Sequence, residues 1–404
     1  MKIKEIKAKK ISNSRNQDTI QIFIKTDIGK AEASAPSGAS KSKKEVMDFP
    51  SSGVKTSVEF VNNVLNQELK DFEINEFNDF EKIENILKKY DDTERWEKIG
   101  GNTVIALEFA LLKMLSKGKI WSYLNPGTEK LPRPLGNIIG GGAHVKKTNA
   151  PEIQEFLLLS LNCKSFTKAA YANYKIHKLV KKQIKKYLSR PKMTDEGAWS
   201  PELTIEEILD VLTKVVTDYN KTIDFEVRIG LDVAADSFYN GKEYVYRNKK
   251  LTRKEQIKYM INLIEKYNLC YVEDPLEEND FKGFAEITKK VRKTCLICGD
   301  DLIATKIELL KKAIKENAIT SLIVKPNQIG SIVKTREIIK FAKENRIYPV
   351  ISHRSGETMD STIADLSVAF NVPIIKCGIY GKEREAKINR IIDIEEEIKR
   401  TKKK

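Results

Sequence analysis

The stretch Cys270-Tyr-Val-Glu273 decides the fold, because it is an apolar run of strand length that ends in a carboxylate. Other runs in the second half of the chain have the same form, and each also ends in a charged side chain or a histidine. Most successive runs end about 25 residues apart, which fits one strand and one helix per repeat of a β/α barrel. The longer interval before Glu273 leaves room for an added hairpin. The six runs end at Asp232, Glu273, Asp300, Lys325, His353 and Lys376.

Helix starts lie between these runs. Thr204, Thr252 and Thr305 are each followed three residues later by Glu, which is the capping-box pattern of a helix N-terminus. Alternating strands and helices predict a parallel sheet, and fully apolar strands predict burial on both faces. A closed β/α (TIM-like) barrel over residues 129–404 satisfies both conditions, so we expect an α/β fold with a barrel as its catalytic domain.

Residues 1–128 predict a separate N-terminal α+β domain that caps the barrel and carries a mobile loop. Thr19-Ile-Gln-Ile-Phe-Ile-Lys25 alternates apolar and polar side chains like a strand with one buried face, and Ala31 to Ala35 continues as a second strand. Apolar side chains at helical spacing then mark three helices. These side chains are Val58, Val61, Val64 and Leu65; Phe80, Ile83, Ile86 and Leu87; and Val104, Leu107, Leu111, Met114 and Leu115.

The composition is that of a globular chain with a very polar surface, with 41% hydrophobic and 32% charged residues. The net charge is +15, from 72 basic and 57 acidic residues. Because Lys and Glu are interleaved, we interpret this excess as a Lys-rich solvated surface and expect no nucleic-acid partner. No apolar stretch is long enough for a membrane span. Five cysteines and a basic start without a signal-peptide core predict reduced thiols and a cytoplasmic location.

Three strand ends carry carboxylates in successive repeats. Because the C-terminal strand ends of a β/α barrel face one shared mouth, we expect Asp232, Glu273 and Asp300 to converge there. Three carboxylates suit a hard cation such as Mg²⁺, which takes oxygen ligands and keeps positions for water and substrate. The alternative, separate surface ion pairs with nearby Lys, does not account for three acids at equivalent strand ends.

Basic side chains complete this ring. Lys325 ends the next strand, and a Lys among acidic neighbours and a metal ion can act as a base. His353 and Lys376 follow at the last two strand ends. Ser352-His-Arg-Ser-Gly-Glu357 offers an Arg and a hydroxyl for gripping a phosphate. Pro36-Ser-Gly-Ala-Ser40 is a hydroxyl-rich loop that could close as a lid.

On these residues the chain resembles the enolase (phosphopyruvate hydratase) family, of the archaeal and bacterial kind, over nearly its whole length. The order and spacing of the matching segments are highly specific. They are Pro36-Ser-Gly-Ala-Ser40, Asn137-Ile-Ile139 with His144, Gln154-Glu155-Phe156, Asp195-Glu-Gly197, Leu231-Asp-Val-Ala-Ala235, Glu273-Asp-Pro275, Gly299-Asp-Asp-Leu302, Lys325-Pro-Asn-Gln-Ile-Gly330, Ser352-His-Arg-Ser-Gly-Glu-Thr358 and Ile375-Lys376.

The resemblance implies a lyase that reversibly dehydrates 2-phosphoglycerate to phosphoenolpyruvate in glycolysis and gluconeogenesis, with two Mg²⁺ ions per site. Lys325 would abstract the C2 proton, and Glu196 would protonate the departing C3 hydroxyl as general acid. Asp232, Glu273 and Asp300 would hold the first Mg²⁺, and Ser40 on the loop would help to hold the second.

The resemblance also assigns the substrate-binding residues. Glu155 would support Glu196 as its neighbour. The others divide by what they contact: Gln154 and Lys376 the carboxylate side of the substrate, His144 and His353 the pocket wall, and Arg354 and Ser355 the phosphate. Family members form homodimers or larger assemblies, so we expect a homo-oligomer.

The chain departs from the family pattern outside the proposed ligands, base and acid. Asn13-Ser-Arg-Asn-Gln-Asp-Thr19 replaces Asp-Ser-Arg-Gly-Asn-Pro-Thr, Lys41-Ser42 replaces the Thr-Gly after Ser40, and Ala198 replaces a Gly. These changes put subunit contacts and lid closure in question rather than the metal site.

Two other functions stay open at this point. A racemase or cycloisomerase of the wider enolase superfamily would share the metal-binding barrel, but it would use a Lys-x-Lys base motif and bind no phosphate. A catalytically inactive, enolase-like binding protein would use the Lys-rich surface and the Lys402-Lys403-Lys404 tail instead.

Overall fold

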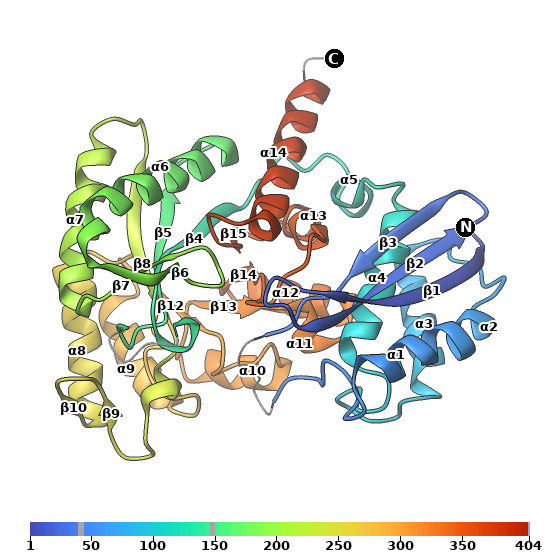
Figure 1. Cartoon of the computed structure of the whole chain (residues 1–404), viewed down its shortest axis with the longest axis horizontal. Helices are drawn as coiled ribbons and strands as arrows, with labels where there is room; N and C mark the ends of the chain where they lie inside the picture. Colours follow the sequence, from blue (N-terminus) through green and yellow to red (C-terminus); the bar gives the residue numbers. More distant parts are fainter. Residues whose placement is uncertain (39–43, 146–149, 403–404) are drawn as a thin grey trace. The chain divides into compact units, whose positions relative to one another are not determined.

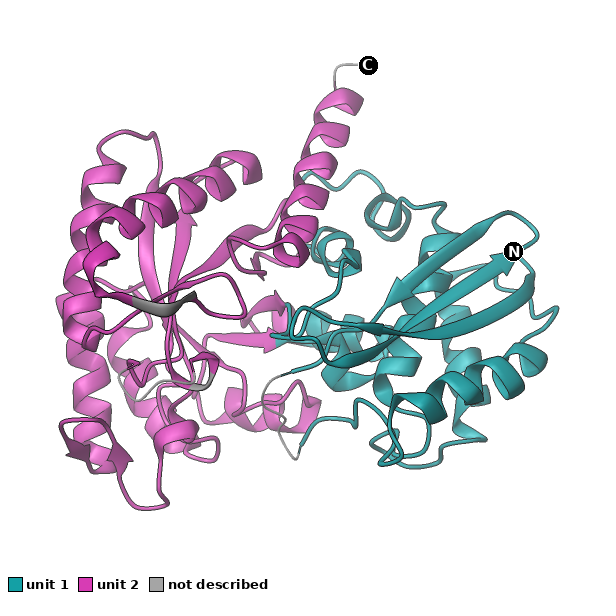
Figure 2. Ribbon diagram, viewed as in Figure 1, with its two compact units in different colours: residues 1–130, 324–341, 353–371 teal, residues 131–323, 342–352, 372–404 magenta. Residues whose placement is uncertain are grey.

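The computed structural model of the chain describes residues 1–38, 44–145 and 150–402. The chain forms two compact units, coloured teal and magenta in Figure 2. Two stretches that directly follow barrel strands belong with the N-terminal residues in unit 1. Unit 1 is residues 1–130, 324–341 and 353–371, and unit 2 is residues 131–323, 342–352 and 372–404.

Unit 1 contains a sequential antiparallel sheet of β1 (Ile3–Ser12), β2 (Asp18–Thr26) and β3 (Lys30–Ser34). The last two strands confirm the predicted ones, and β1 was not predicted. Ile20, Ile22 and Ile24 alternate along β2 with side chains fully removed from solvent. Helix α4 (Gly101–Leu115) packs against β2 and β3, so these isoleucines form part of an apolar core. Burying one such side chain stabilises the fold by about 1.5–3 kcal/mol.

Asparagine side chains cover the outer edge of this sheet. Asn62 Oδ1 accepts the N–H of Ala8 at 2.7 Å, and Asn66 Oδ1 accepts the N–H of Ile6 at 2.8 Å. Both asparagines lie on the helical segment that follows Gly53, where a π-turn, η1, brings them to β1. The otherwise open edge of the sheet is thereby blocked against pairing with another strand.

Among the helices of unit 1, α4 is buried along most of its length. Gly100 directly precedes α4 and has φ 86°. A Cβ added at Gly100 would lie 2.6 Å from the carbonyl oxygen of Asp48. The helices are α1 (Val54–Phe60), η1 (Val61–Leu65), α2 (Asn66–Glu68), η2 (Phe77–Asp79), α3 (Phe80–Lys88), α4, α5 (Ile120–Leu124), α11 (Pro326–Ile329), α13 (Thr362–Ala369) and most of α12 (Ile332–Glu344).

In unit 2 a ring of eight strands among the described residues closes into a barrel, because β15 pairs with β4. The predicted β/α barrel with a separate α+β unit is thus confirmed. Around the ring the strands are β4 (Arg133–Gly140), β5 (Glu155–Leu161), β8 (Glu226–Asp232), β11 (Tyr271–Glu273), β12 (Leu296–Gly299), β13 (Ser321–Val324), β14 (Tyr348–Ser352) and β15 (Ile374–Lys376). Two further strands, β6 (Leu188–Met193) and β7 (Trp199–Pro201), extend the sheet beside β4.

The predicted parallel pairing is confirmed among the predicted strands whose register is described, but β5, a strand that was not predicted, departs from it. β5 runs antiparallel to both of its neighbours, β4 and β8. The short connection from β4 to β5 contains only the turn η3 (Gly142–His144) and no crossover helix among its described residues, and a parallel pair needs such a crossover. The longer interval before Glu273 contains an added hairpin, as expected, formed by β9 (Tyr244–Val245) and β10 (Lys250–Leu251).

Apolar side chains from the strands fill the barrel, and helices lie outside it (Figure 1). The buried cluster comprises Leu135, Leu157, Leu159, Cys270, Tyr271, Cys298, Ile323, Val350 and Ile374. The covering helices are α6 (Phe166–Ile184), η4 (Lys185–Tyr187), α7 (Ile205–Asn220), η5 (Ala235–Phe238), α8 (Arg253–Lys266), α9 (Phe281–Val291), α10 (Ile307–Lys315) and α14 (Lys382–Lys402). Such a core makes the barrel a packed scaffold for its strand ends.

Two of the three predicted capping boxes are confirmed. Thr204 caps α7 and Thr252 caps α8, each with its partner Glu bonded back to the N-cap backbone N–H. The box at Thr305 is wrong, because α10 begins at Ile307 after Lys306. Thr305 instead has φ 51°, in the left-handed region, where an N-cap residue does not lie.

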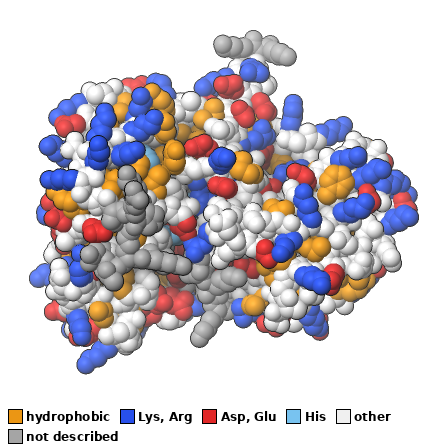
Figure 3. Space-filling model, viewed as in Figure 1, with side chains coloured by type: hydrophobic (Ala, Val, Ile, Leu, Met, Phe, Trp, Pro, Cys, Tyr) orange, Lys and Arg blue, Asp and Glu red, His pale blue; other side chains and the backbone are white. Residues whose placement is uncertain are grey.

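Lys and Arg side chains lie among Asp and Glu over the face drawn in Figure 3. None of the described helices combines the length and apolar character that crossing a membrane requires. All five cysteines are free thiols, and Cys295 and Cys298 are buried.

Candidate active site

Carboxylates from three barrel strands meet in unit 2. Asp232 and Glu273 are the last residues of β8 and β11, and the parallel register pairs them. Glu155 begins β5, and the antiparallel register places it opposite Asp232. All three are nearly fully buried. The antiparallel strand therefore adds a carboxylate to the same edge of the barrel.

Lys376, the last residue of β15, lies among these carboxylates. Its Nζ is 2.8 Å from Asp232 Oδ2, 2.9 Å from Glu273 Oε1 and 3.2 Å from Glu155 Oε2. Burial by itself would lower the pKa of Lys376, but the attraction of the three carboxylates holds that pKa well above its usual value. The ammonium group stays charged and offsets the repulsion among its neighbours.

Glu155 and Gln154 flank Asp232. The Nε2 group of Gln154 donates a hydrogen bond to Asp232 Oδ2 at 3.2 Å. Gln154, predicted to contact the substrate, is therefore bonded in this structure to Asp232, a predicted metal ligand. Burial, with the nearby charges of Glu196 and Asp232, raises the pKa of Glu155 well above its usual value, against the lowering effect of Lys376. Glu155 is thus a carboxyl group that holds a proton readily.

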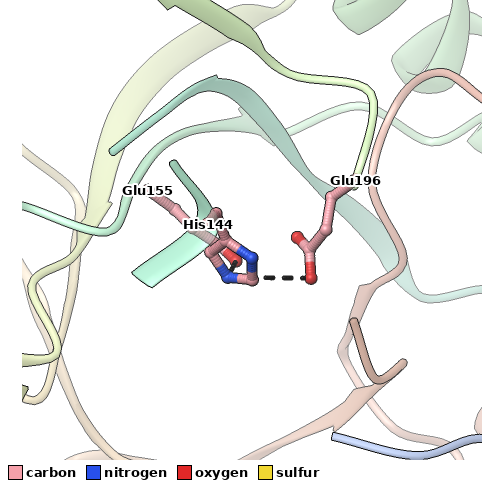
Figure 4. A group of neighbouring side chains, drawn as sticks. All are labelled: His144, Glu155 and Glu196. Carbon is pink, nitrogen blue, oxygen red and sulfur yellow. Dashed lines mark ion pairs between the residues drawn. The ribbon is translucent and has the colours of Figure 1, made fainter. Parts of the chain in front are cut away.

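His144 joins this group to the Glu196 loop, as Figure 4 shows. Its Nε2 is 3.6 Å from Glu155 Oε1 and 3.8 Å from Glu196 Oε1. Its Nδ1 is 3.1 Å from Asp195 Oδ1. Burial would lower the pKa of His144, but the carboxylates of Glu196, Asp195 and Glu155 raise it to about 9. The ring is therefore a buried cation at neutral pH.

Glu196 belongs to the loop of residues 194–198, which connects β6 to β7. Its Oε2 accepts a hydrogen bond from Asn137 Nδ2 at 3.3 Å. Asn137 lies on β4, so the strand holds one side of the carboxylate and His144 faces the other. The predicted general acid thus has a fixed direction within a buried site.

Asp274 ties the ends of β11 and β12 together. Its carboxylate accepts the backbone N–H of Asp300 at 3.0 Å and that of Asp301 at 2.7 Å. Asp274 has φ 42°, in the left-handed region that Asp and Asn adopt more readily than most residues other than Gly. Burial, together with the charges of Asp301 and Asp300, raises the pKa of Asp274 well above its usual value.

The donor set at the strand ends fits a hard divalent cation, because Asp232, Glu273 and Asp300 all supply carboxylate oxygens. Among the described residues, however, these three do not form one group with ligand atoms within 4.8 Å of one another. Asp300 instead groups with Asp274 and Asp301. A second group with ligand atoms this close together is His144 with Glu155 and Glu196.

Unit 1 contains the predicted phosphate-binding residues Arg354 and Ser355. Arg354 Nη1 donates to Glu45 Oε2 at 2.9 Å and to Asn327 Oδ1 at 3.0 Å, and all three residues are buried. The Ser355 carbonyl accepts a hydrogen bond from the hydroxyl of Ser14 at 3.1 Å. The arginine is therefore held in place by its own unit.

The remaining predicted residues are placed as follows. Lys325 follows β13 directly and is the N-cap residue of α11. His353 follows β14 directly and is buried. Ala39 and Ser40 lie outside the described residues, whereas Pro36 to Gly38 of the predicted lid lie within them.

Sequence reasoning gave no role to several residues of this site. Asn137, Asp195 and Asp274 appeared only inside quoted motifs, and Glu45 appeared in none. Asp274 had a usable signal, because it directly follows a strand-end carboxylate. Glu45 had none, since it is distant in sequence from the Arg354 that it contacts.

Comparison with known proteins matches both parts of the chain to one family. The model of "Enolase, N-terminal domain" matches residues 3–123, and that of "Enolase, C-terminal TIM barrel domain" matches residues 128–403. The enolase of Methanosphaera stadtmanae is 43% identical over 98% of this chain and 97% of its own length. The enolases of Methanothermobacter thermautotrophicus and Archaeoglobus fulgidus are 40% and 38% identical, each over 98% of this chain and over 97% and 98% of their own lengths.

A barrel with charged strand ends and a separate α+β unit in one chain define an enolase-type α/β protein. With both family models and full-length relatives matching, the chain belongs to the enolase family.

Proposed function

We propose that this chain catalyses the reversible dehydration of 2-phosphoglycerate to phosphoenolpyruvate, as a Mg²⁺-dependent hydro-lyase of glycolysis and gluconeogenesis. Family membership supports the reaction and its need for a divalent cation. The observation that carries the assignment to this site is the convergence of Asp232, Glu273 and Glu155 on the charged Lys376. That arrangement offers both oxygen ligands and a fixed positive charge.

Asp232, Glu273 and Asp300 would hold one Mg²⁺, and Ser40 would contribute to a second. When bound, the ions supply the positive charge that stabilises an enolate next to a carboxylate. Lys376 adds a fixed cation of this chain to the same task. The buried, hydrogen-bonded position of Lys376 means that little reorganisation accompanies the reaction.

Lys325 is the proposed base that takes the C2 proton. It follows β13 directly, so it comes from a strand end as catalytic barrel residues do. The proposed acid is Glu196, which would give a proton to the departing C3 hydroxyl. Glu155 supports this role as the neighbour of Glu196 across His144, whose Nε2 lies 3.6 Å from Glu155 Oε1 and 3.8 Å from Glu196 Oε1.

Substrate binding is assigned to Gln154, His144 and Lys376 and to His353, Arg354 and Ser355. Arg354 suits a phosphate because its fork can donate two parallel hydrogen bonds. We also propose that the protein is cytoplasmic and forms a homo-oligomer. Light scattering on purified protein tests the oligomeric state.

The experiment that tests the function measures phosphoenolpyruvate formation by absorbance, with and without Mg²⁺. We expect Mg²⁺-dependent turnover of 2-phosphoglycerate. Turnover of a non-phosphorylated acid alone would favour the racemase or cycloisomerase alternative, and no Mg²⁺-dependent signal at all would favour the inactive binding protein.

Two variants separate the proposed base from the proposed acid. Lys325→Ala should lose both dehydration and the exchange of the C2 proton with deuterated solvent. Glu196→Gln should lose dehydration but keep the exchange, because proton removal precedes loss of the hydroxyl. A Lys325→Ala variant with normal turnover would remove Lys325 from the mechanism.

A further inference from the structure

His177 is a buried histidine that the proposed mechanism does not use. It lies on α6, and its Nε2 is 3.0 Å from the backbone carbonyl oxygen of Gly197, the residue after Glu196. A carbonyl oxygen only accepts hydrogen bonds, so Nε2 carries the proton and donates. Burial lowers the pKa of His177 to about 4, and the ring is neutral at physiological pH.

Aromatic neighbours fix the plane of this ring. The His177 ring stacks on Trp199 with centroids 4.7 Å apart and on Tyr380 with centroids 5.8 Å apart. The indole N–H of Trp199 also donates to the backbone carbonyl of His177 at 2.9 Å. The donor that faces Gly197 therefore has little freedom to turn away.

Gly197 is pressed against its surroundings in a conformation that favours glycine. Its φ is 77°, and a Cβ there would lie 2.1 Å from the carbonyl oxygen of Tyr380. The loop is closed on itself, because the N–H of Thr194 donates to the carbonyl of Ala198 at 2.8 Å and Thr194 Oγ1 accepts the N–H of Glu196 at 3.2 Å. Such a small loop transmits a displacement of Gly197 to its neighbours.

Those neighbours are the two acidic residues around His144. Asp195 contacts Nδ1 of His144, and Glu196 faces Nε2 of the same ring. We propose that His177 is a positioning residue: by donating to the Gly197 carbonyl, it fixes the loop that aims Glu196 at the reacting hydroxyl. The inference rests on the proposed function for the role of Glu196 as the acid.

Two variants distinguish positioning from packing. His177→Phe keeps an aromatic ring between Trp199 and Tyr380 but loses the donor. His177→Gln gives up the ring but keeps an N–H donor at a reach similar to that of Nε2. If the hydrogen bond positions the loop, His177→Phe should lose about a hundredfold in kcat with KM nearly unchanged, as misplacement by about 1 Å does elsewhere, and His177→Gln should stay within a few-fold of wild type.

A second readout locates the defect. His177→Phe should still exchange the C2 proton of 2-phosphoglycerate with deuterated solvent, because this step uses Lys325 and not Glu196. Wild-type kcat in His177→Phe, or equal losses of kcat in the two variants, would overturn the proposal. So would loss of proton exchange in parallel with dehydration.

Nuclear magnetic resonance tests the inference without relying on turnover. The chain has three histidines, so ¹⁵N-histidine spectra are simple to assign. In the wild type, His177 should be the Nε2–H tautomer with a slowly exchanging proton, and the Nδ1–H tautomer would overturn the proposal even if His177→Phe does not fold. The ring signals of His144 should shift in His177→Phe and not in His177→Gln. Wild-type protein that shows these signals but does not turn over 2-phosphoglycerate would refute the proposed function and leave only the contact by which His177 fixes the loop of residues 194–198.

Discussion

His144 is a buried cation whose charge depends on three carboxylates, and its titration is measurable at the scale of one residue. Its folded-state pKa of about 9 lies above the value near 6.5 of an unfolded histidine. A raised pKa contributes stability that is fully present below about pH 6.5 and is lost as pH rises through about 9. A shift of this size corresponds to about 3 kcal/mol, as an upper estimate.

We therefore predict that the free energy of unfolding of metal-free protein falls between pH 6.5 and 9 by up to this amount. Urea denaturation at several pH values measures it, with His144→Gln as the control that lacks the slope. In spectra of the folded protein, the His144 midpoint should fall in Glu196→Gln, because one attracting charge is gone. A wild-type midpoint at or below 6.5 would contradict the ion-pair cluster.

At the scale of elements, the site depends on how neighbouring strand ends are joined. Asp274 accepts two backbone N–H groups from the turn that carries Asp300 and Asp301, and so fixes that turn to the end of β11. Residues that orient metal ligands in this way typically contribute 10–100-fold, roughly, to metal affinity. Asp300 lies beyond the last residue of β12, so the two strands by themselves do not fix its position.

Asp274→Asn tests this connection. Asn tolerates the left-handed backbone but replaces one acceptor by an N–H₂ group that faces a backbone N–H. We predict that calorimetric titration with Mg²⁺ shows affinity weakened by about tenfold or more, with the barrel still folded. Asp224→Asn, at a side chain 75% exposed, is the matched control and should bind as wild type does. Unchanged affinity in Asp274→Asn would mean that the turn holds its shape without this carboxylate.

Helix capping predicts a stability effect without a functional one. Thr252, which is not among the proposed ligands, base or acid, caps α8 through its hydroxyl and the side chain of Glu255. Thr252→Ala should lower the free energy of unfolding by about 0.5–2 kcal/mol, measured by urea denaturation, because an orphan N–H of the helix start loses its acceptor. Thr252→Ser keeps the hydroxyl and should be nearly neutral. Turnover should be the same in both variants, and a large loss of kcat would show that α8 communicates with the site.

For the whole molecule, the barrel core and the charged edge are separable. The core consists of apolar side chains from the strands, whereas the edge holds Lys376 among its carboxylates. We predict that chelation of divalent ions abolishes turnover reversibly and leaves the far-ultraviolet circular dichroism unchanged. Mg²⁺ at a hundredfold excess over its Kd should stabilise the fold by about 2.7 kcal/mol, seen as a raised Tm. Glu273→Gln should lose most of that rise, and unfolding on chelation alone would show that the metal holds the barrel together.

The architecture was predictable to a large extent because strand length, spacing and capping are local signals. The six apolar runs became neighbouring barrel strands, and the interval before Glu273 contained the hairpin of β9 and β10. The reversed strand β5 was not predictable from the same signals, because an apolar strand buried on both faces has the same pattern in either direction. The capping box at Thr305 failed for a similar reason, since its pattern describes a possible cap and not the backbone that packing imposes.

The sequence by itself determined the fold class, the family and which charged side chains stand at strand ends, because these depend on order and spacing along the chain. Only the tertiary structure decided which of those charges meet. It placed Lys376 between Asp232 and Glu273, and it surrounded His144 with carboxylates from separate segments. It also placed His177 against the carbonyl that follows Glu196. Charges interact through distances of a few ångströms, and barrel closure and loop packing set those distances between residues far apart in sequence.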